Sequence, residues 1–168
     1  MVMNLLPEGF TIRTGLLPGD LGYLTYLHGK IYGEEYGFDT TFEPYVARPL
    51  SDFSLSEDKS RQCVWIVELN MRIVGSIAIV DAGNNEAQLR WLMLTKETRG
   101  KGLGGKLMGK ALDFCREKEF ERVFLWTIDA LEAARALYMK NGFEVTEEKR
   151  HVIWGVDVNE QRYTLRLD

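Results

Sequence analysis

The feature that most constrains this chain is a glycine-rich segment between an apolar run and an amphipathic helix pattern. Residues 98–106 read Thr-Arg-Gly-Lys-Gly-Leu-Gly-Gly-Lys, and the apolar run of residues 89–94 precedes them. Glycine lets the backbone bend sharply and leaves its N–H groups bare, and the N-terminus of the following helix carries a partial positive charge. Together with the charges of Arg99, Lys101 and Lys106, this turn predicts a socket for a pyrophosphate group.

The bulk composition indicates one globular domain over residues 1–168. Apolar residues make up 45% of the chain, and the net charge of −4 argues against a nucleic-acid partner, which normally requires a basic face. No apolar run approaches the roughly 20 residues that span a bilayer, and residues 1–10 lack a signal-peptide pattern. We therefore expect a cytoplasmic protein with no membrane partner. Cys63 and Cys115 indicate buried thiols, and the scattered His and Cys residues predict no metal site.

Hydrophobic periodicity predicts the element order β α α β β β α β α β β. Asp20 is expected to cap the first helix, and Pro49 to kink or break the second. Residues 70–72 predict a hairpin turn within a three-strand antiparallel meander. The expected strands are residues 10–14, 63–69, 73–80, 86–95, 122–128, 143–146 and 161–167, and the expected helices are residues 20–36, 39–56, 103–118 and 130–140.

The glycine segment admits other interpretations. Gly100, Gly102 and Gly105 form a literal G-x-G-x-x-G, and Asp129 follows at the distance expected of a dinucleotide-binding fold. Residues 96–99 separate these glycines from the strand, however, and the preceding strands form hairpins instead of β-α-β units. A P-loop pattern is absent. A glycine turn with no ligand is disfavoured because four glycines destabilise a helix start.

Two motifs carry a resemblance that covers nearly the whole chain. Arg99-x-x-Gly102-x-Gly104 matches [QR]-x-x-G-x-[GA], and residues 134–143 match A-x-x-[FL]-Y-x-K-x-G-F. The chain thus resembles GNAT-type N-acetyltransferases, which bind acetyl-coenzyme A. The resemblance implies an α+β fold, an α/β/α sandwich around a mixed, mostly antiparallel sheet of about seven strands with a central splayed parallel pair. Residues 28–38 and the tail with His151 and Trp154 are similar to the acetyltransferase half of MarR-type repressor fusions, although no repressor half is present.

The resemblance also implies where acetyl-CoA binds. The pantetheine arm is expected to pair with the strand before the loop like an added strand, and the Leu92 N–H is the expected oxyanion donor. Many relatives carry Asn where this chain has Leu131, so one polar coenzyme contact is expected to be lost. The implied coenzyme-binding residues are Leu92, Met93, Leu94, Arg99, Gly100, Lys101, Gly102, Leu103, Gly104, Gly105, Lys106 and Ala134.

Acetyl transfer to an amine needs an acid and a base. Tyr138 occupies the family's general-acid position, and its alternative role is packing against coenzyme or core. An alkyl amine with a pKa near about 10.4 is almost fully protonated at neutral pH, so a group or water must take its proton. Glu35 is the tentative base, while Glu34, Glu86, His28 and an ordered water remain open alternatives.

The acceptor is expected to meet Tyr32, Glu35 and Tyr36, because carboxylates and aromatic faces attract a cationic amine. A polyamine, amino acid or amino sugar is favoured, and a peptide or protein amine stays open. The sequence thus predicts an acetyl-CoA-dependent N-acetyltransferase that works by direct attack in a ternary complex, since neither cysteine lies in a motif. The alternative is a non-catalytic acyl-CoA-binding sensor or partner module. A homodimer is the default expectation.

Overall fold

The structure is a computed structural model that describes residues 5–168. Residues 1–4 belong to the segment where no signal peptide is expected, and they lie outside the described residues. The described elements, in chain order, are β1 (Phe10–Thr14), α1 (Asp20–Tyr36), α2 (Phe42–Leu55), β2 (Cys63–Leu69), β3 (Arg72–Asp81), β4 (Glu86–Leu94), a 3₁₀ turn (Lys96–Thr98), α3 (Leu103–Glu117), β5 (Arg122–Ile128), α4 (Glu132–Lys140), β6 (Glu144–Ile153) and β7 (Val156–Arg166).

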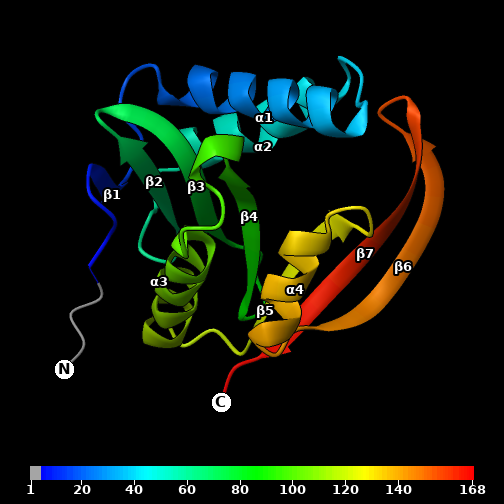
Figure 1. The fold of residues 1–168 in the computed structure, drawn as a ribbon. Helices are drawn as coiled ribbons and strands as arrows, with labels where there is room; N and C mark the ends of the chain where they lie inside the picture. The colour runs from blue at the N-terminus through cyan, green and yellow to red at the C-terminus, as the bar shows by residue number, and fades with distance from the viewer. Residues whose placement is uncertain (1–4) are drawn as a thin grey trace.

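The strands form one sheet in the order β1-β2-β3-β4-β5-β7-β6 (Figure 1). Neighbouring strands pair antiparallel except β4 and β5, which run parallel. That parallel pairing joins only residues 86–88 to residues 122–124, and beyond it the two strands separate. The predicted mixed sheet with a splayed central pair is therefore confirmed.

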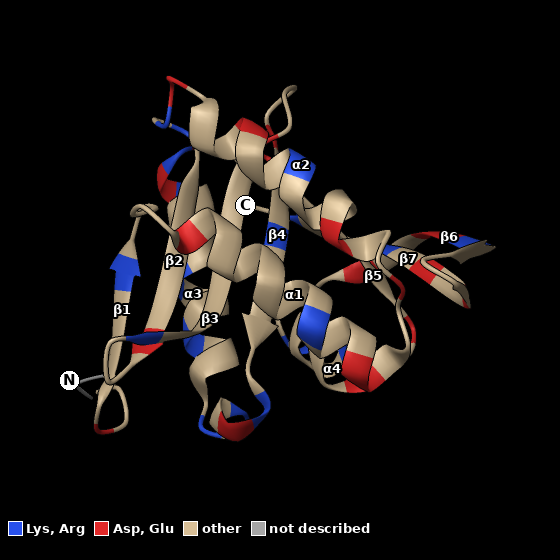
Figure 2. Ribbon diagram, turned by 90° about the horizontal axis from the view of Figure 1, so that it is seen from above, with Lys and Arg blue, Asp and Glu red and all other residues tan. Residues whose placement is uncertain are grey.

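Helices cover both faces of this sheet (Figures 1 and 2). One apolar core joins Leu107 and Ala111 of α3 to inward side chains such as Ile77 of β3. A second core on the opposite face joins Leu24 of α1 and Leu50 of α2 to the sheet. Burying a side chain of this size contributes roughly 1.5–3 kcal/mol to stability. The α/β/α sandwich is thus confirmed, with two cores that share the sheet.

The meander before the glycine loop also forms as predicted. Asn70 and Met71 connect β2 to β3 with φ values of 50° and 67°. Two consecutive residues in the left-handed region are typical of a tight hairpin turn whose twist matches the flanking strands. The strand at residues 122–128 has the predicted bounds.

The N-terminus of α1 differs from its prediction. Asp20 is the first helical residue, and Gly19, with φ of 93°, occupies the cap position without a side-chain bond. The Asp20 carboxylate instead accepts a hydrogen bond from the Leu17 N–H at 2.7 Å and pairs with Arg13 at 3.0 Å. It therefore ties the turn before the helix to β1.

The second helix is shorter at its start than predicted and continues through its proline. The Asp39 carboxylate accepts from the Thr41 N–H at 2.9 Å, which holds residues 39–41 in a turn. Pro49 lies inside α2 and does not end it. Leu50 and Phe53 beyond it are buried, so their packing maintains the helix despite the missing N–H donor.

The last two strands are much longer than predicted, since β6 and β7 form a hairpin over residues 144–166. The side chains of β6 are nearly all exposed, so the strand lacks the apolar alternation by which a strand is recognised. Its tip turns at Trp154 and Gly155, and the Trp154 carbonyl accepts from the Asp39 N–H at 2.9 Å. The tip of the hairpin therefore contacts the connection between α1 and α2 (Figure 1).

Candidate active site

The glycine loop is anchored at its start by two buried threonines. The Thr95 N–H donates to the Val74 carbonyl at 2.8 Å, and the Thr98 hydroxyl donates to the Thr95 carbonyl at 2.8 Å. Both side chains are buried. The end of β4 and the 3₁₀ turn are thereby held against β3, so the loop that follows starts from a rigid base.

The loop itself exposes main-chain N–H groups. Gly100 and Gly102 have φ values of 73° and 77°, and a Cβ added at either would meet nothing within 4 Å. Gly102 caps α3, whose first backbone bond runs from the Lys106 N–H to the Gly102 carbonyl. The N–H groups of the first helical turn therefore have no helical partner and point out at the loop. This geometry fits a diphosphate.

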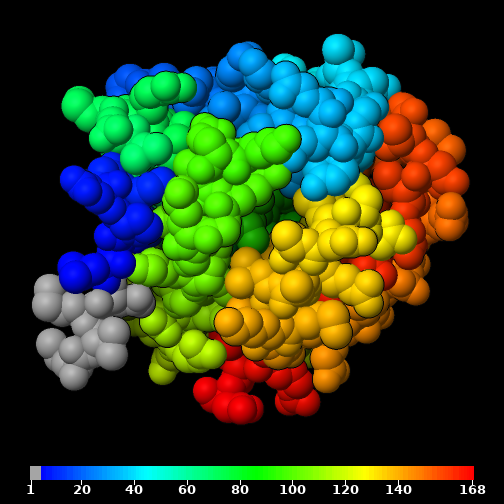
Figure 3. All heavy atoms as spheres, viewed as in Figure 1, coloured from blue at the N-terminus to red at the C-terminus, as the bar shows by residue number. Residues whose placement is uncertain are grey.

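A cavity opens from this loop and passes between α1 and α4. Figure 3 shows the corresponding hollow between the blue helix, the green loop and the yellow-orange helix. Most predicted coenzyme residues line it, whereas Lys101, Gly105 and Lys106 do not. The predicted residues that do line it are Leu92, Met93, Leu94, Arg99, Gly100, Gly102, Leu103, Gly104 and Ala134, joined by Tyr32 and Tyr36 from the predicted acceptor set.

A β-bulge shapes β4 where the cavity meets the sheet. Trp91 has φ of 51°, and the register with β3 shifts between Ser76 and Ala78. The Ser76 hydroxyl donates to the Trp91 carbonyl at 2.6 Å, which satisfies this buried oxygen. Since β5 has already separated from β4 here, the β4 backbone near Leu92 faces the cleft and fits an added extended chain.

Tyr138 lies in α4, within the second of the two motifs. It is 5% exposed, and its ring contacts those of Phe143 and Tyr163. Burial raises the pKa of the Tyr138 phenol, so the hydroxyl stays protonated. Its side chain also lines a second cavity, so the packing role and a hydrogen-bonding role are compatible.

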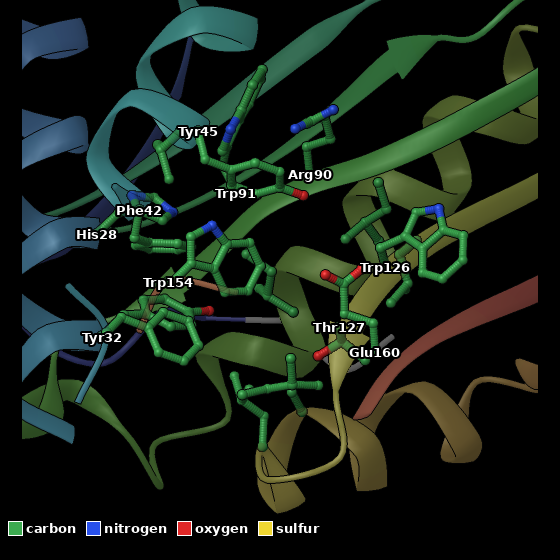
Figure 4. A pocket seen from close by; sticks show the side chains of 18 of the residues that line it. His28, Tyr32, Phe42, Tyr45, Arg90, Trp91, Trp126, Thr127, Trp154 and Glu160 are labelled. Atoms are coloured by element: carbon green, nitrogen blue, oxygen red, sulfur yellow. The ribbon is translucent and has the colours of Figure 1, made fainter. Parts of the chain in front are cut away.

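The second cavity lies next to the first, because Tyr32, Leu92, Leu131 and Ala134 line both. Its walls come from α1, α2, β4, β5, α4 and the β6–β7 hairpin, and they are rich in aromatic side chains (Figure 4). Leu131 also occupies the cap position of α4 and forms no side-chain cap bond there. We name the two cavities after the ligands that the sequence predicts for them: the cavity at the glycine loop is the coenzyme cavity, and this one is the acceptor cavity.

Charged side chains of the acceptor cavity were missed by sequence reasoning. Glu160 of β7 points into it (Figure 4), and its carboxylate lies 2.9 Å from Nε2 of His151 on β6. Arg90 of β4 enters from another wall. Neither residue lies in a recognisable motif, and the long β6–β7 pairing that brings Glu160 to the site was itself not predicted.

The predicted bases lie in different places. Glu35 binds the Arg99 guanidinium through both oxygens, at 2.5 and 2.7 Å, and this contact lowers the pKa of the Glu35 carboxyl. It lines neither cavity. Glu86 pairs with Arg122 and Arg162 at the opposite end of β4. Glu35 therefore lies beside the glycine loop in an ion pair with Arg99, and its role as the base stays a prediction.

The remaining base candidates also have structural explanations. Glu34 is exposed and lies 3.9 Å from Lys30. His28 lines the acceptor cavity, but its Nδ1–H donates to the Leu24 carbonyl at 2.7 Å, and burial lowers the pKa of the imidazole to about 4. His28 is therefore neutral at pH 7, and its Nε2 has no partner among the described residues.

The cysteines do not contribute nucleophiles to either cavity. Burial raises the pKa of the Cys63 thiol to about 11 and that of Cys115 to about 12. A thiol of such high pKa forms almost no thiolate at neutral pH. Among residues 5–168, no three His, Cys, Asp or Glu side chains lie close enough together to hold a metal ion.

Comparison with known proteins agrees with this geometry. The family model described as the acetyltransferase (GNAT) family matches residues 29–143, which include the glycine loop, the splayed strands and Tyr138. The chain belongs to the GNAT acetyltransferase family. No helix within residues 5–168 combines the length and apolar character that crossing a bilayer requires.

Several relatives of this GNAT protein are similar over most of its length. It is 32% identical over 114 residues to "Uncharacterized N-acetyltransferase YjgM" of Escherichia coli, covering 66% of this chain and 68% of that protein. It is 27% identical over 145 residues to "Probable N-acetyltransferase camello" of Xenopus tropicalis, covering 80% of this chain and 66% of that protein. The chain thus spans between about half and two thirds of the length of the camello relatives.

The fold is shared with solved structures. The structure of yncA from Salmonella typhimurium, determined with its cofactor acetyl-CoA, matches with a TM-score of 0.76 and 18% identity. The match covers 96% of this chain and 95% of that chain. At this identity the likeness establishes the fold alone.

Proposed function

We propose that this GNAT protein transfers an acetyl group from acetyl-CoA to a primary amine, with residues 1–168 acting as one domain. The observation that carries the proposal is that two cavities lie side by side where β4 and β5 separate. One cavity ends in the exposed N–H groups of the glycine loop, and the other ends in charged and aromatic side chains. This arrangement suits a diphosphate-bearing donor on one side and a small amine on the other.

The chemistry balances as a direct transfer. The acceptor amine attacks the thioester carbonyl, so that a C–N bond forms, the C–S bond breaks, and an amide and a free thiol result. The backbone of β4 near Leu92 aligns the donor, and its N–H stabilises the developing negative charge on the carbonyl oxygen. Shielding from water in the cleft strengthens this interaction.

Two side chains move the protons in this proposal. Tyr138 donates its hydroxyl proton to the leaving sulfur and regains a proton from solvent. Glu160 takes the proton of the acceptor amine, with His151 holding the carboxylate in place at 2.9 Å. Glu160 replaces the tentative base Glu35, whose ion pair with Arg99 leaves it outside the acceptor cavity. Glu35 instead holds the Arg99 side chain at the coenzyme loop.

Finer expectations from the sequence remain predictions. The likeness of residues 28–38 and of the tail to repressor-linked acetyltransferases is one of them, since none of the relatives reported above is described as such a fusion. A cytoplasmic location, the absence of nucleic-acid and membrane partners and a homodimer also remain predictions. No observation among residues 5–168 favours the alternative of a non-catalytic coenzyme sensor.

The test is Tyr138→Phe, which removes one oxygen and keeps the ring. Calorimetry is expected to give an unchanged Kd for CoA, while turnover, followed as free thiol released in the presence of an amine panel, falls by about 10-fold or more. Tyr163→Phe is the matched control, because this buried tyrosine packs on Tyr138 but lines neither cavity, and it should keep wild-type turnover. Unchanged turnover in Tyr138→Phe would remove the acid assignment.

A further inference from the structure

Arg90 lines the acceptor cavity and has no counter-ion among residues 5–168. Its polar contact among the described residues is Gln88 Oε1 at 3.4 Å, and its guanidinium lies 5.3 Å from the Trp91 ring centroid. The other described arginines without an ion pair, Arg48, Arg72, Arg135 and Arg166, all have exposed side chains. A half-buried guanidinium with no anion is costly, and a bound anion offsets this cost.

Arg90 lies next to the bulge in β4 and shares its face of the sheet with Gln88. Alternation along a regular strand would place residues 90 and 91 on opposite faces of the sheet. The bulge at Trp91 interrupts the alternation, so that Arg90 and Trp91 both line the acceptor cavity (Figure 4). Since the same bulge shapes the cleft, Arg90 is held next to the proposed transfer site.

A second, opposite charge faces the same space. Glu160 enters from β7. Burial raises the pKa of the Tyr45 phenol, and both charges also act on it, since Arg90 lowers that pKa and Glu160 raises it. Figure 4 shows the Tyr45 hydroxyl between Arg90 and Glu160, and all three residues line the same cavity. The cavity thus offers one positive and one negative group to a single small ligand.

The remaining wall is aromatic. Phe42, Tyr45 and Trp154 pack on one another with ring centroids 4.9–6.0 Å apart. Such faces accept an apolar side chain. A polyamine suits this cavity less well, because a second cationic group would approach the unpaired Arg90.

We propose that the acceptor is a free amino acid whose carboxylate binds Arg90 and whose amine faces Glu160. This inference rests on the proposed function and narrows its substrate to amines that carry a carboxylate. The planar guanidinium can bind a carboxylate through two parallel hydrogen bonds. The aromatic wall favours amino acids with apolar side chains, such as leucine and phenylalanine.

The test compares acceptors that differ only in the carboxylate. Phenylalanine, phenylalaninamide and phenethylamine are assayed as acceptors by thiol release, with leucine, leucinamide and spermidine as further members. Phenylalanine and leucine are expected to exceed their amides by at least about 10-fold in kcat/KM. Arg90→Gln should raise KM for the two amino acids by at least 10-fold and leave the amides unchanged. Arg48→Gln removes an exposed charge outside both cavities and should behave as wild type.

Direct binding provides a readout independent of turnover. Calorimetric titration of phenylalanine into the protein saturated with CoA should give heat in the wild type and in Arg48→Gln, and none in Arg90→Gln. If the wild type has equal kcat/KM for the amino acids and their amides, the amino-acid proposal is overturned. The same holds if Arg90→Gln lowers kcat/KM equally for all acceptors. In both cases the proposed acetyltransferase function still stands. Coenzyme binding with no acetylation of any amine overturns the proposed function and this inference together.

Discussion

Placing a carboxylate on Gly102 tests the diphosphate socket directly. Gly102 has φ of 77°, so any side chain there is strained by about 1 kcal/mol even though a Cβ meets nothing within 4 Å. For a protein of this size, that strain lowers Tm by about 2–4 °C. This part of the effect has nothing to do with a ligand.

The charge of Gly102→Glu adds a second effect that appears only when coenzyme binds. Two unit charges about 4 Å apart repel by about 4 kcal/mol near a protein surface, before salt screening. Since 1.4 kcal/mol corresponds to about a tenfold change in Kd, binding should weaken by roughly 10³-fold. Gly102→Ala, which adds bulk without charge, should weaken it far less.

Gly83 provides a matched control at the other end of β4. It has φ of 82° and nothing within 4 Å of an added Cβ, so Gly83→Glu carries the same strain and the same charge. Thermal unfolding without coenzyme should show similar losses in Tm for both glutamate variants. Calorimetry with CoA should show binding in Gly83→Glu and none in Gly102→Glu. Wild-type affinity in Gly102→Glu, or an equal loss in both, would refute the placement of the diphosphate.

Two further perturbations probe the site's framework. Burial lowers the pKa of His28 to about 4, whereas an unfolded histidine has a pKa near about 6.5; the unfolded chain alone therefore gains this proton as pH falls. The free energy of unfolding should drop by up to about 3 kcal/mol between pH 6.5 and pH 4. Urea unfolding of His28→Phe should lack this drop. If the wild type and His28→Phe lost stability equally as the pH falls, the assignment would be contradicted. Ser76→Ala leaves the buried Trp91 carbonyl unpartnered, and urea unfolding should show a loss of about 1–3 kcal/mol, while Ser60→Ala on an exposed turn should be neutral.

Local signals predicted most of the fold because they act through near neighbours in the chain. The strand at residues 122–128 and the turn at Asn70 and Met71 formed as expected, since apolar alternation and turn propensity are properties of short segments. Pro49 shows where local reasoning fails, because the buried side chains of α2 outweigh one lost backbone bond. The length of β6 was underestimated for another reason. Its exposed side chains lack apolar alternation, and its pairing with β7 is made by the backbone.

The residues of the candidate site also differ in whether local sequence predicts them. Most predicted coenzyme residues line one cavity, because glycines at a helix start and a preceding strand lie close together in sequence. Glu35 was expected to face the acceptor, but a contact with Arg99, 64 residues away, holds it elsewhere. Glu160 and Arg90 were not expected at all, since strands far apart in the chain bring them together.

The sequence by itself determined the family, the order of elements and the glycine loop, because motif spacing and periodicity are encoded within single segments. Only the tertiary structure decided which charges line the proposed acceptor cavity. The β-bulge that brings Trp91 to the same face as Arg90 and the hairpin that carries Glu160 both depend on strand register. Register is set by pairing between distant segments, and a shift of one residue moves a side chain to the opposite face of the sheet.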